Sequence, residues 1–225
     1  MTTRIVEVRQ NVLRKNDLLA RELRRRFDAA GTFVVSLVSS PGSGKTTLLE
    51  GTLCALARTA RVAALVGDLA TTRDADRLAR SGAPVRQITT GTVCHLDASM
   101  VESALADWDV GGLDFLFVEN VGNLVCPSSY DLGEHLRVVL LSVTEGEDKP
   151  LKYPTIFNTA DMAVITKTDL ARAAAFDETE ALRNINEVRP GLPVVQVSAR
   201  TGEGFEAWVR ELWVARGRAL TSPLC

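Results

Sequence analysis

The stretch that most constrains this chain is a glycine-rich loop between an apolar segment and a helix-forming one. Residues 39–47 read Ser-Ser-Pro-Gly-Ser-Gly-Lys-Thr-Thr, after the apolar run 33–38 and before Leu-Leu-Glu at 48–50. A buried strand that passes through such a loop into a helix is the context of a phosphate-binding P-loop. Glycines let the backbone N–H groups turn inward, and the positive end of the helix dipole faces the same place. The sequence therefore predicts a site for a nucleoside triphosphate.

Seven residues of this loop are expected to contact the nucleotide: Pro41, Gly42, Ser43, Gly44, Lys45, Thr46 and Thr47. Lys45 would reach the β- and γ-phosphates, and the Thr46 hydroxyl would ligate Mg²⁺. The usual pattern is G-x-x-x-x-G-K-[ST], and Ser39 stands at its first glycine. Because a small residue fits there, we interpret the loop as a variant P-loop. The alternative is a glycine-rich turn with an exposed lysine, which the flanking strand and helix disfavour.

Strands and helices alternate along the chain, a pattern typical of the α/β class. Apolar strands are predicted near 33–38, 62–66, 84–88, 114–120, 138–143, 162–165 and 194–197, with helical patterns between most of them. Residues 144–154 are expected to form an acidic loop. This order predicts a doubly wound, mostly parallel sheet with helices on both faces. We expect residues 1–225 to form a single P-loop GTPase domain, with the helix in 1–31 packed on it.

Composition argues against several other functions. The formal net charge is −2, so no global field would draw the chain to nucleic acid, and Arg24, Arg25 and Arg26 are interpreted as a solvated helix face. The chain contains no signal-like apolar core and no apolar run of about 18 residues, so no membrane association and a cytoplasmic location are expected. Its four cysteines are scattered without a C-x-x-C pair, which favours free thiols or metal ligands over disulfides.

Two carboxylates end strands that should lie beside the P-loop strand. Asp68 follows the strand at 62–66, and Glu119 ends the strand that begins at 114. With Lys45 they are the predicted catalytic residues, and with Thr46 the predicted Mg²⁺ site, because the carboxyl ends of parallel strands face one crevice. Asp68 could instead cap the helix that follows.

The segments that follow these two acids read as nucleotide-sensing loops. Thr71 and Thr72 would sense the γ-phosphate after Asp68, and Val-Gly-Asn at 121–123 would form a switch segment after Glu119. Cys126 comes only seven residues after Glu119, so a switch motion would reach that thiol.

The nucleotide base is predicted to be guanine. Lys167 and Asp169 follow one strand, and Ser198 and Ala199 follow another about 30 residues later. The Asp169 carboxylate can accept from guanine N1–H and the exocyclic amine, and adenine lacks these donors there. Thr166 stands where the usual pattern has Asn, so we expect the loss of one bracing hydrogen bond, roughly 0.5–1.5 kcal/mol. ATP remains the alternative base.

Nearly the whole chain resembles the HypB nickel-insertion GTPases of [NiFe]-hydrogenase maturation, a dimerising P-loop class that also contains the urease accessory protein UreG. The motifs that carry the resemblance are Gly-Thr-Val-Cys-His-Leu-Asp-Ala at 91–98 and Val-Glu-Asn-Val-Gly-Asn-Leu-Val-Cys-Pro at 118–127, together with 39–47, 67–77 and 198–205. The Cys-Pro-His metal motif of UreG is absent. The resemblance implies hydrolysis of GTP to GDP and phosphate at a low intrinsic rate.

Cys94, His95 and Cys126 are the candidate ligands for Ni²⁺ or Zn²⁺. From the residues alone, cysteines buried as small hydrophobes are the favoured interpretation. The resemblance places a metal on these three positions, shared between two subunits of a GTP-dependent homodimer. It also implies two partners, a hydrogenase maturation protein and the hydrogenase large subunit, and a loop lysine, Lys152 more than Lys149, that reaches the guanine site of the other subunit.

The remaining thiols and the second histidine receive lesser expectations. Cys54 is expected in the core and Cys225 in the tail, and His135 is a disfavoured candidate for a peripheral ligand. Three alternative functions remain: a UreG-like urease nickel-insertion GTPase, a metal-free regulatory GTPase with core cysteines, and a small-molecule kinase that uses ATP.

Overall fold

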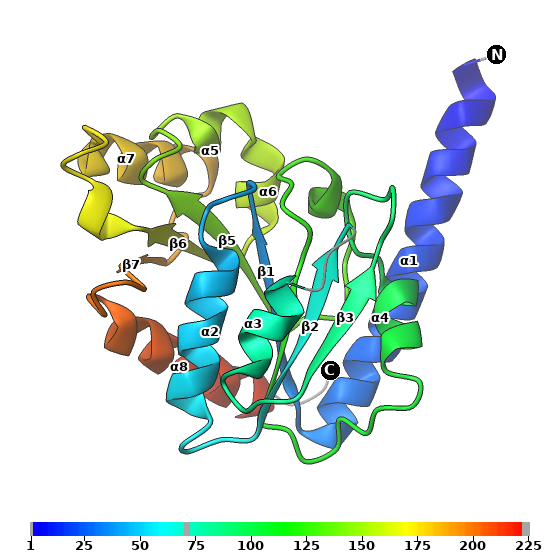
Figure 1. Ribbon diagram of the computed structural model, residues 1–225. Helices are drawn as coiled ribbons and strands as arrows, with labels where there is room; N and C mark the ends of the chain where they lie inside the picture. The colour runs from blue at the N-terminus through cyan, green and yellow to red at the C-terminus, as the bar shows by residue number, and fades with distance from the viewer. Residues whose placement is uncertain (1, 70–72, 222–225) are drawn as a thin grey trace.

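The fold is taken from a computed structural model that describes residues 2–69 and 73–221, with side chains from residue 10 onward (Figure 1). Its centre is a seven-stranded sheet in the order β3-β2-β4-β1-β5-β6-β7, in which every neighbouring pair is parallel. The strands are β1 Phe33–Ser39, β2 Val62–Asp68, β3 Val85–Thr89, β4 Phe115–Glu119, β5 Leu136–Ser142, β6 Met162–Thr166 and β7 Val194–Val197. The predicted parallel α/β sheet is confirmed.

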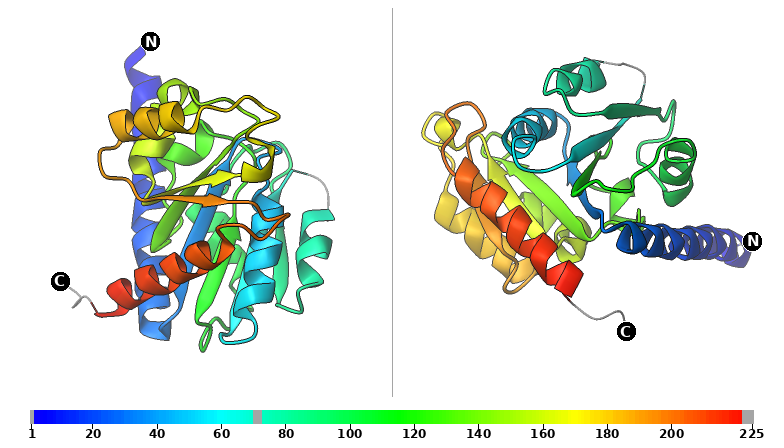
Figure 2. Two further views of the ribbon diagram at one scale, coloured as in Figure 1. Left: turned by 90° about the vertical axis from the view of Figure 1, so that its left-hand side faces the viewer. Right: turned by 90° about the horizontal axis from the view of Figure 1, so that it is seen from below.

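Helices cover both faces of this sheet (Figures 1 and 2). They are α1 Thr2–Ala30, α2 Lys45–Leu56, α3 Arg73–Ala79, α4 Ala98–Ala104, α5 Lys149–Lys152, α6 Pro154–Thr159, α7 Glu178–Val188 and α8 Phe205–Thr221, with 3₁₀ turns η1 Cys126–Ser129 and η2 Thr168–Leu170. The buried clusters place α2, α3 and α8 on one face and α1, α4, α6 and α7 on the other. Within the described residues, no helix combines the length and apolar character needed to cross a membrane.

The alternation of side chains along β1 shows how both layers are anchored. Val35 packs into the cluster under α2 and α8, whereas Val34 packs with α1 and α4 on the opposite face. On the first face Trp208 is fully buried and its indole N–H donates to Thr52 Oγ1 at 2.8 Å. Because strands buried on both faces must be apolar throughout, the continuous hydrophobic runs of the sequence are accounted for.

The path of the chain creates a crevice at the carboxyl end of β1. After β1 the chain forms β2 and β3 on one side, adds β4 between β2 and β1, and crosses to the other side for β5, β6 and β7. Ligands of open α/β sheets bind where the strand order reverses in this way. The loops that carry the predicted site residues all leave strands at this edge.

The long helix α1 packs through its C-terminal half and extends beyond the body of the molecule at its N-terminal end (Figures 1 and 2). The prediction of a solvated arginine face holds for Arg25 and Arg26, which are exposed, and is wrong for Arg24, which is half-buried. Arg24 Nε donates to the Gly133 carbonyl at 2.8 Å, and Arg26 Nη2 donates to the Leu105 carbonyl at 3.1 Å. These side chains tie α1 to loops on two sides.

The prediction of a loop over residues 144–154 is also partly wrong, because α5 lies within this segment and α6 begins at its end. Pro150 and Pro154 occupy the first turns of these two short helices. A proline there loses no intrahelical hydrogen bond and fixes a helical φ, so these prolines start helices where we had expected an irregular segment.

Candidate nucleotide and metal site

The P-loop holds its lysine through the residue that departs from the usual pattern. Gly42 and Gly44 have φ of 73° and 98°, a conformation that favours glycine. Lys45 is buried, and its Nζ donates to Ser39 Oγ at 2.9 Å. The Ser43 hydroxyl also donates to Ser39 Oγ. Ser39 is therefore more than a tolerated small residue, since its hydroxyl fixes the lysine and the loop together.

Glu119 is a buried acid with one unpartnered oxygen. The Thr46 hydroxyl donates to Glu119 Oε1 at 2.7 Å, while Oε2 has no hydrogen-bond partner among the described residues. Burial raises the pKa of Glu119 to about 7, although Lys45 and Thr46 act in the opposite direction. Burial likewise lowers the pKa of Lys45, opposed by Glu119. A hard cation such as Mg²⁺ takes oxygen ligands of this kind, so the vacant carboxylate oxygen and the Thr46 hydroxyl fit it.

A cleft of about 560 Å³ opens in front of these groups. Lys45, Thr46, Asp68 and Glu119 all line it, so the structure brings together the residues predicted for phosphate and Mg²⁺. Asp68 Oδ1 accepts from the Leu69 N–H at 2.6 Å. Thr71 and Thr72, predicted to sense the γ-phosphate, lie outside the described residues.

Two further residues of α3 line the same cleft and were missed from the sequence. Asp74 and Arg77 both face it, and Arg77 Nε pairs with Glu50 Oε2 at 2.7 Å. Their spacing of three puts them on one face of a helix, and that signal could have identified them.

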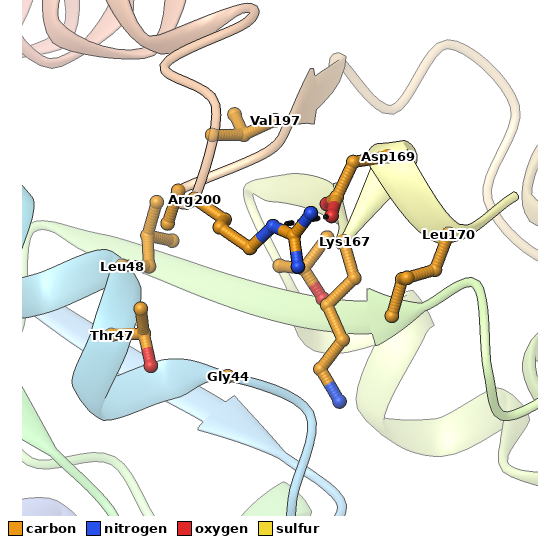
Figure 3. A pocket seen from close by; sticks show the side chains of 10 residues that line it. Gly44, Thr47, Leu48, Lys167, Asp169, Leu170, Val197 and Arg200 are labelled. Atoms are coloured by element: carbon orange, nitrogen blue, oxygen red, sulfur yellow. Dashed lines mark ion pairs between the residues drawn. The ribbon is translucent and has the colours of Figure 1, made fainter.

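A second pocket of about 170 Å³ continues from the cleft and holds the predicted base-reading residues (Figure 3). Lys167 lines both spaces, and its Nζ donates to the Gly42 carbonyl at 2.6 Å. Asp169 Oδ1 accepts from Ser198 Oγ at 2.7 Å, and Ala199 lines the pocket beside them. Arg200, which the sequence did not reveal, lies with its Nε 3.4 Å from Asp169 Oδ2, as Figure 3 shows.

Thr166 stabilises the base-binding loop through a hydrogen bond of its own. Its buried hydroxyl donates to the Ser43 carbonyl at 2.6 Å and so connects the end of β6 to the P-loop. The expected loss of a hydrogen bond at this position is therefore wrong, because a threonine hydroxyl reaches the acceptor.

The three predicted metal ligands converge in space. Cys94 Sγ lies 2.8 Å from Cys126 Sγ and 4.0 Å from His95 Nδ1. One ligand atom from each residue lies within 4.8 Å of the other two, and no other group of three such residues occurs in the described part of the chain. All three side chains are half-buried, which disfavours the interpretation as core hydrophobes. Two thiols and an imidazole suit Ni²⁺ or Zn²⁺ but leave a four-coordinate site incomplete.

Two loops supply this cluster. Cys94 and His95 follow β3, whereas Cys126 begins η1 after β4. The His95 ring lies against Tyr130, with ring centroids 4.0 Å apart, and burial lowers its pKa, so the imidazole is neutral and able to ligate a metal at pH 7. The Cys94 thiol and burial raise the pKa of Cys126. The metal-free site therefore favours the protonated Cys126 thiol.

The other thiols and the second histidine lie apart from the cluster. Cys54 is exposed on α2, so its expected core position is wrong, and Cys225 lies outside the described residues. His135 Nδ1 accepts from the Val34 N–H at 2.9 Å, and Nε2 donates to Asp28 Oδ1 at 2.9 Å. With both ring nitrogens engaged, His135 connects α1 to β1 and does not serve as a peripheral ligand.

The fold and the cleft define a P-loop nucleotide-binding protein, and comparison with known proteins is more specific. Residues 33–196 match the family model described as the CobW/HypB/UreG nucleotide-binding domain. The hydrogenase maturation factor HypB of Azotobacter vinelandii is 50% identical over 218 residues, which are 96% of this chain and 71% of that protein. The chain belongs to the HypB family of hydrogenase maturation factors.

Two solved structures resemble the fold over most of their length. HypB from Helicobacter pylori, in complex with nickel, has a TM-score of 0.86 at 42% identity and matches over 94% of this chain and 99% of its own. HypB from Archaeoglobus fulgidus has a TM-score of 0.84 at 38% identity, over 90% of this chain and 98% of its own.

Proposed function

We propose that this chain is a GTP-hydrolysing metallochaperone that binds Ni²⁺ and delivers it during [NiFe]-hydrogenase maturation. The observation that carries the proposal is the convergence of Cys94, His95 and Cys126 within 4.8 Å, on loops at the same sheet edge as the nucleotide cleft. The nickel complex of the Helicobacter pylori relative supports this choice of metal. Zn²⁺ prefers the same ligand types and is the competing ion.

For hydrolysis, the chain would bind GTP with the phosphates at Lys45 and the guanine at Asp169. Mg²⁺, held by Thr46, Asp68 and Glu119, would neutralise phosphate charge, and the two carboxylates would orient the attacking water. Arg200 would release Asp169 Oδ2 so that this carboxylate accepts from guanine, while the Ala199 N–H donates to guanine O6. After hydrolysis, GDP would keep the same guanine contacts.

A second copy of the chain would complete the metal site. Three ligands per chain under-fill a tetrahedral or square-planar ion, and a two-fold interface supplies further ligands by symmetry. GTP would order residues 119–127 and favour the dimer, and hydrolysis would release nickel to a maturation partner and then to the hydrogenase large subunit. Lys149 and Lys152 are the candidates to reach the partner's guanine; here Lys152 pairs with Asp148 at 2.5 Å, and Lys149 lies over the Tyr153 ring.

Nickel binding by cysteine variants tests the metal assignment. Equilibrium dialysis should show that Cys126→Ser and Cys94→Ser bind nickel much more weakly than the wild type, while the exposed Cys54→Ser variant binds it as the wild type does. A weakening beyond the roughly 10- to 100-fold caused by changes around a metal site is expected for a ligand. Equal nickel binding by Cys54→Ser and Cys126→Ser would refute the site and favour a metal-free GTPase.

Nucleotide dependence tests the rest of the proposal. Light scattering should show a dimer with Mg²⁺ and a non-hydrolysable GTP analogue, and nickel affinity should differ between that state and the GDP state. The same nickel affinity in both states would contradict the coupling. Phosphate release from GTP but not from ATP separates this function from that of an ATP-dependent kinase.

A further inference from the structure

Leu96 connects the nucleotide cleft to the metal cluster. It directly follows His95 in the chain and is fully buried. Its N–H donates to Asn120 Oδ1 at 3.0 Å, and Asn120 directly follows Glu119 at the end of β4. One residue thus stands between a candidate metal ligand and the segment that carries the buried carboxylate.

Asn120 lines the phosphate cleft and is also bonded to the loop that carries His95. The residue is 2% exposed and lines the phosphate cleft, while its Oδ1 also accepts from the Val121 N–H at 2.9 Å. A single oxygen therefore binds one N–H of the switch segment and one of the metal loop. Leaving either N–H buried without a partner is unfavourable, so the two segments are expected to move together.

Close packing prevents the surrounding residues from absorbing such a movement. A Cβ added to Gly67, the residue before Asp68, would lie 2.8 Å from Leu96 Cγ, so the tip of β2 touches the Leu96 side chain. A Cβ added to Gly122 would lie 2.9 Å from Pro41 Cα, so the switch segment rests on the P-loop. Packed contacts of this kind shift between discrete arrangements and do not deform continuously.

We propose that Asn120 and Leu96 are the positioning residues through which occupancy of the triphosphate cleft sets the place of His95. The inference rests on the proposed function and deepens it, since it assigns the coupling of nucleotide to metal to one hydrogen bond and one side-chain contact. When the end of β4 moves with the nucleotide state, the Leu96 N–H follows Asn120, and His95 moves relative to the two thiols. The bond from Asn123 Nδ2 to the Cys94 carbonyl at 3.3 Å joins the two metal loops but does not reach the cleft.

A second buried amide holds the same loop from the opposite side and provides a matched control. Asn16 of α1 accepts from the Ala98 N–H through Oδ1 at 2.9 Å and donates from Nδ2 to the Asp131 carbonyl at 2.9 Å. It is 7% exposed and takes no part in lining the phosphate cleft. Asn16 therefore supports the metal loops without contact to the nucleotide.

The experiment measures nickel dissociation constants at saturating Mg²⁺·GDP and at saturating Mg²⁺ with a non-hydrolysable GTP analogue. For the wild-type chain we expect the two constants to differ by roughly 5- to 150-fold, the usual range of coupling between sites. Asn120→Ala should bring this ratio close to one. Asn120→Asp, whose carboxylate oxygen can accept from the same two N–H groups, should restore much of it. Asn16→Ala should weaken nickel in both states and leave the ratio unchanged.

The thiolate-to-nickel absorption band serves as a second readout of nickel coordination. In Asn120→Ala this band should no longer differ between the GDP state and the GTP-analogue state, whereas a purely structural defect would leave that difference in place. A wild-type ratio that persists in Asn120→Ala overturns this inference and leaves the proposed function standing. A wild-type chain without nickel binding, or with no nucleotide dependence, overturns both. If Asn120→Ala does not fold, Gly67→Ala replaces it: the added methyl group displaces Leu96 and should reduce the ratio, and an unchanged ratio in that folded variant overturns the inference.

Discussion

The phosphate end and the metal end of this molecule lie at the same edge of one sheet but are built differently. At the phosphate end, Lys45 is fixed by Ser39 and Thr46 by Glu119, and all four residues are on or directly beside β1, α2 and β4. At the metal end, three half-buried side chains come from two loops, and their ligand atoms lie within 4.8 Å of one another. The first arrangement is held by regular secondary structure, and the second depends on where two loops lie.

This difference suggests a division of roles. A site on strands and helix ends is preorganised, so it can bind a phosphate without rearrangement. A site on loops is less rigid, and its geometry can follow a neighbour. We therefore expect changes at the phosphate end to act on nucleotide chemistry with little effect on metal affinity in the GDP state.

The largest effect is expected for Lys45→Ala. Lys45 is buried, and its Nζ donates to Ser39 Oγ. Its positive charge would stabilise the negative charge that develops on the transferring phosphoryl group. Loss of such a stabilising group should lower kcat for GTP hydrolysis about 10²- to 10³-fold, as measured by phosphate release. Nickel affinity with GDP bound should stay at the wild-type value. A parallel collapse of nickel binding would show that the two ends are a single rigid unit.

A pH effect on stability should follow from Glu119 in the nucleotide-free protein. Its pKa is raised from the usual 4.5 to about 7 by burial, so the folded state binds the proton more tightly than the unfolded state. This contribution is fully present below pH 4.5 and declines as pH rises toward 7, by on the order of 3 kcal/mol.

Urea unfolding at pH 5 and pH 7.5 measures this contribution. Glu119→Gln should flatten the decline, and the difference between variant and wild type isolates Glu119 from other buried groups that titrate. Mg²⁺·GDP should also reduce the decline, because a cation at the vacant carboxylate oxygen stabilises the charged form. Equal slopes for the variant and the wild type would show that the carboxylate is not desolvated in solution.

The metal end should respond to pH in the opposite sense. The Cys94 thiol and burial raise the pKa of Cys126, and a thiol must lose its proton to bind nickel. Below that raised pKa, nickel affinity should rise with pH by about tenfold per unit for each proton released. Chelator competition at pH 6.5, 7.5 and 8.5 measures the slope. Cys54→Ser should keep the wild-type slope and Cys126→Ser should reduce it, whereas a pH-independent affinity would argue against thiolate ligands.

The sequence predicted contiguous motifs and missed contacts between distant segments. Lys45, Glu119 and Asp169 were found because parallel strands end at one edge, so a motif at each strand end places its side chain. The bond from Asn16 to Asp131 crosses 115 positions, and no periodicity reveals such a partner. The contact of Arg200 with Asp169 was missed for the same reason. The hydroxyl bonds of Ser39 are local, and they were missed because Ser39 was interpreted only as a small residue that fits in place of glycine.

Helix geometry explains the error at Cys54. Leu49, Leu53 and Leu56 share the buried face of α2, and position 54 lies about 100° around the helix from position 53. The residue type favoured the core, but its angular position places it in solvent. Residue type alone could not decide between the two.

The smallest effect is expected at Thr166, where the phosphate end meets the base pocket. Thr166→Val keeps the shape of the side chain but removes the hydroxyl that donates to the Ser43 carbonyl at 2.6 Å. The loss of one such bond should cost about 1 kcal/mol, which lowers the affinity for nucleotide several-fold. The affinities for GTP and GDP should fall equally, because the bond holds the loop and does not contact the γ-phosphate. Titration with a fluorescent GDP measures this change, and Thr166→Ser, which retains the hydroxyl, should bind GDP nearly as the wild type does. An unchanged affinity in Thr166→Val would show that the P-loop needs no brace from β6, and that backbone geometry alone preorganises the phosphate end.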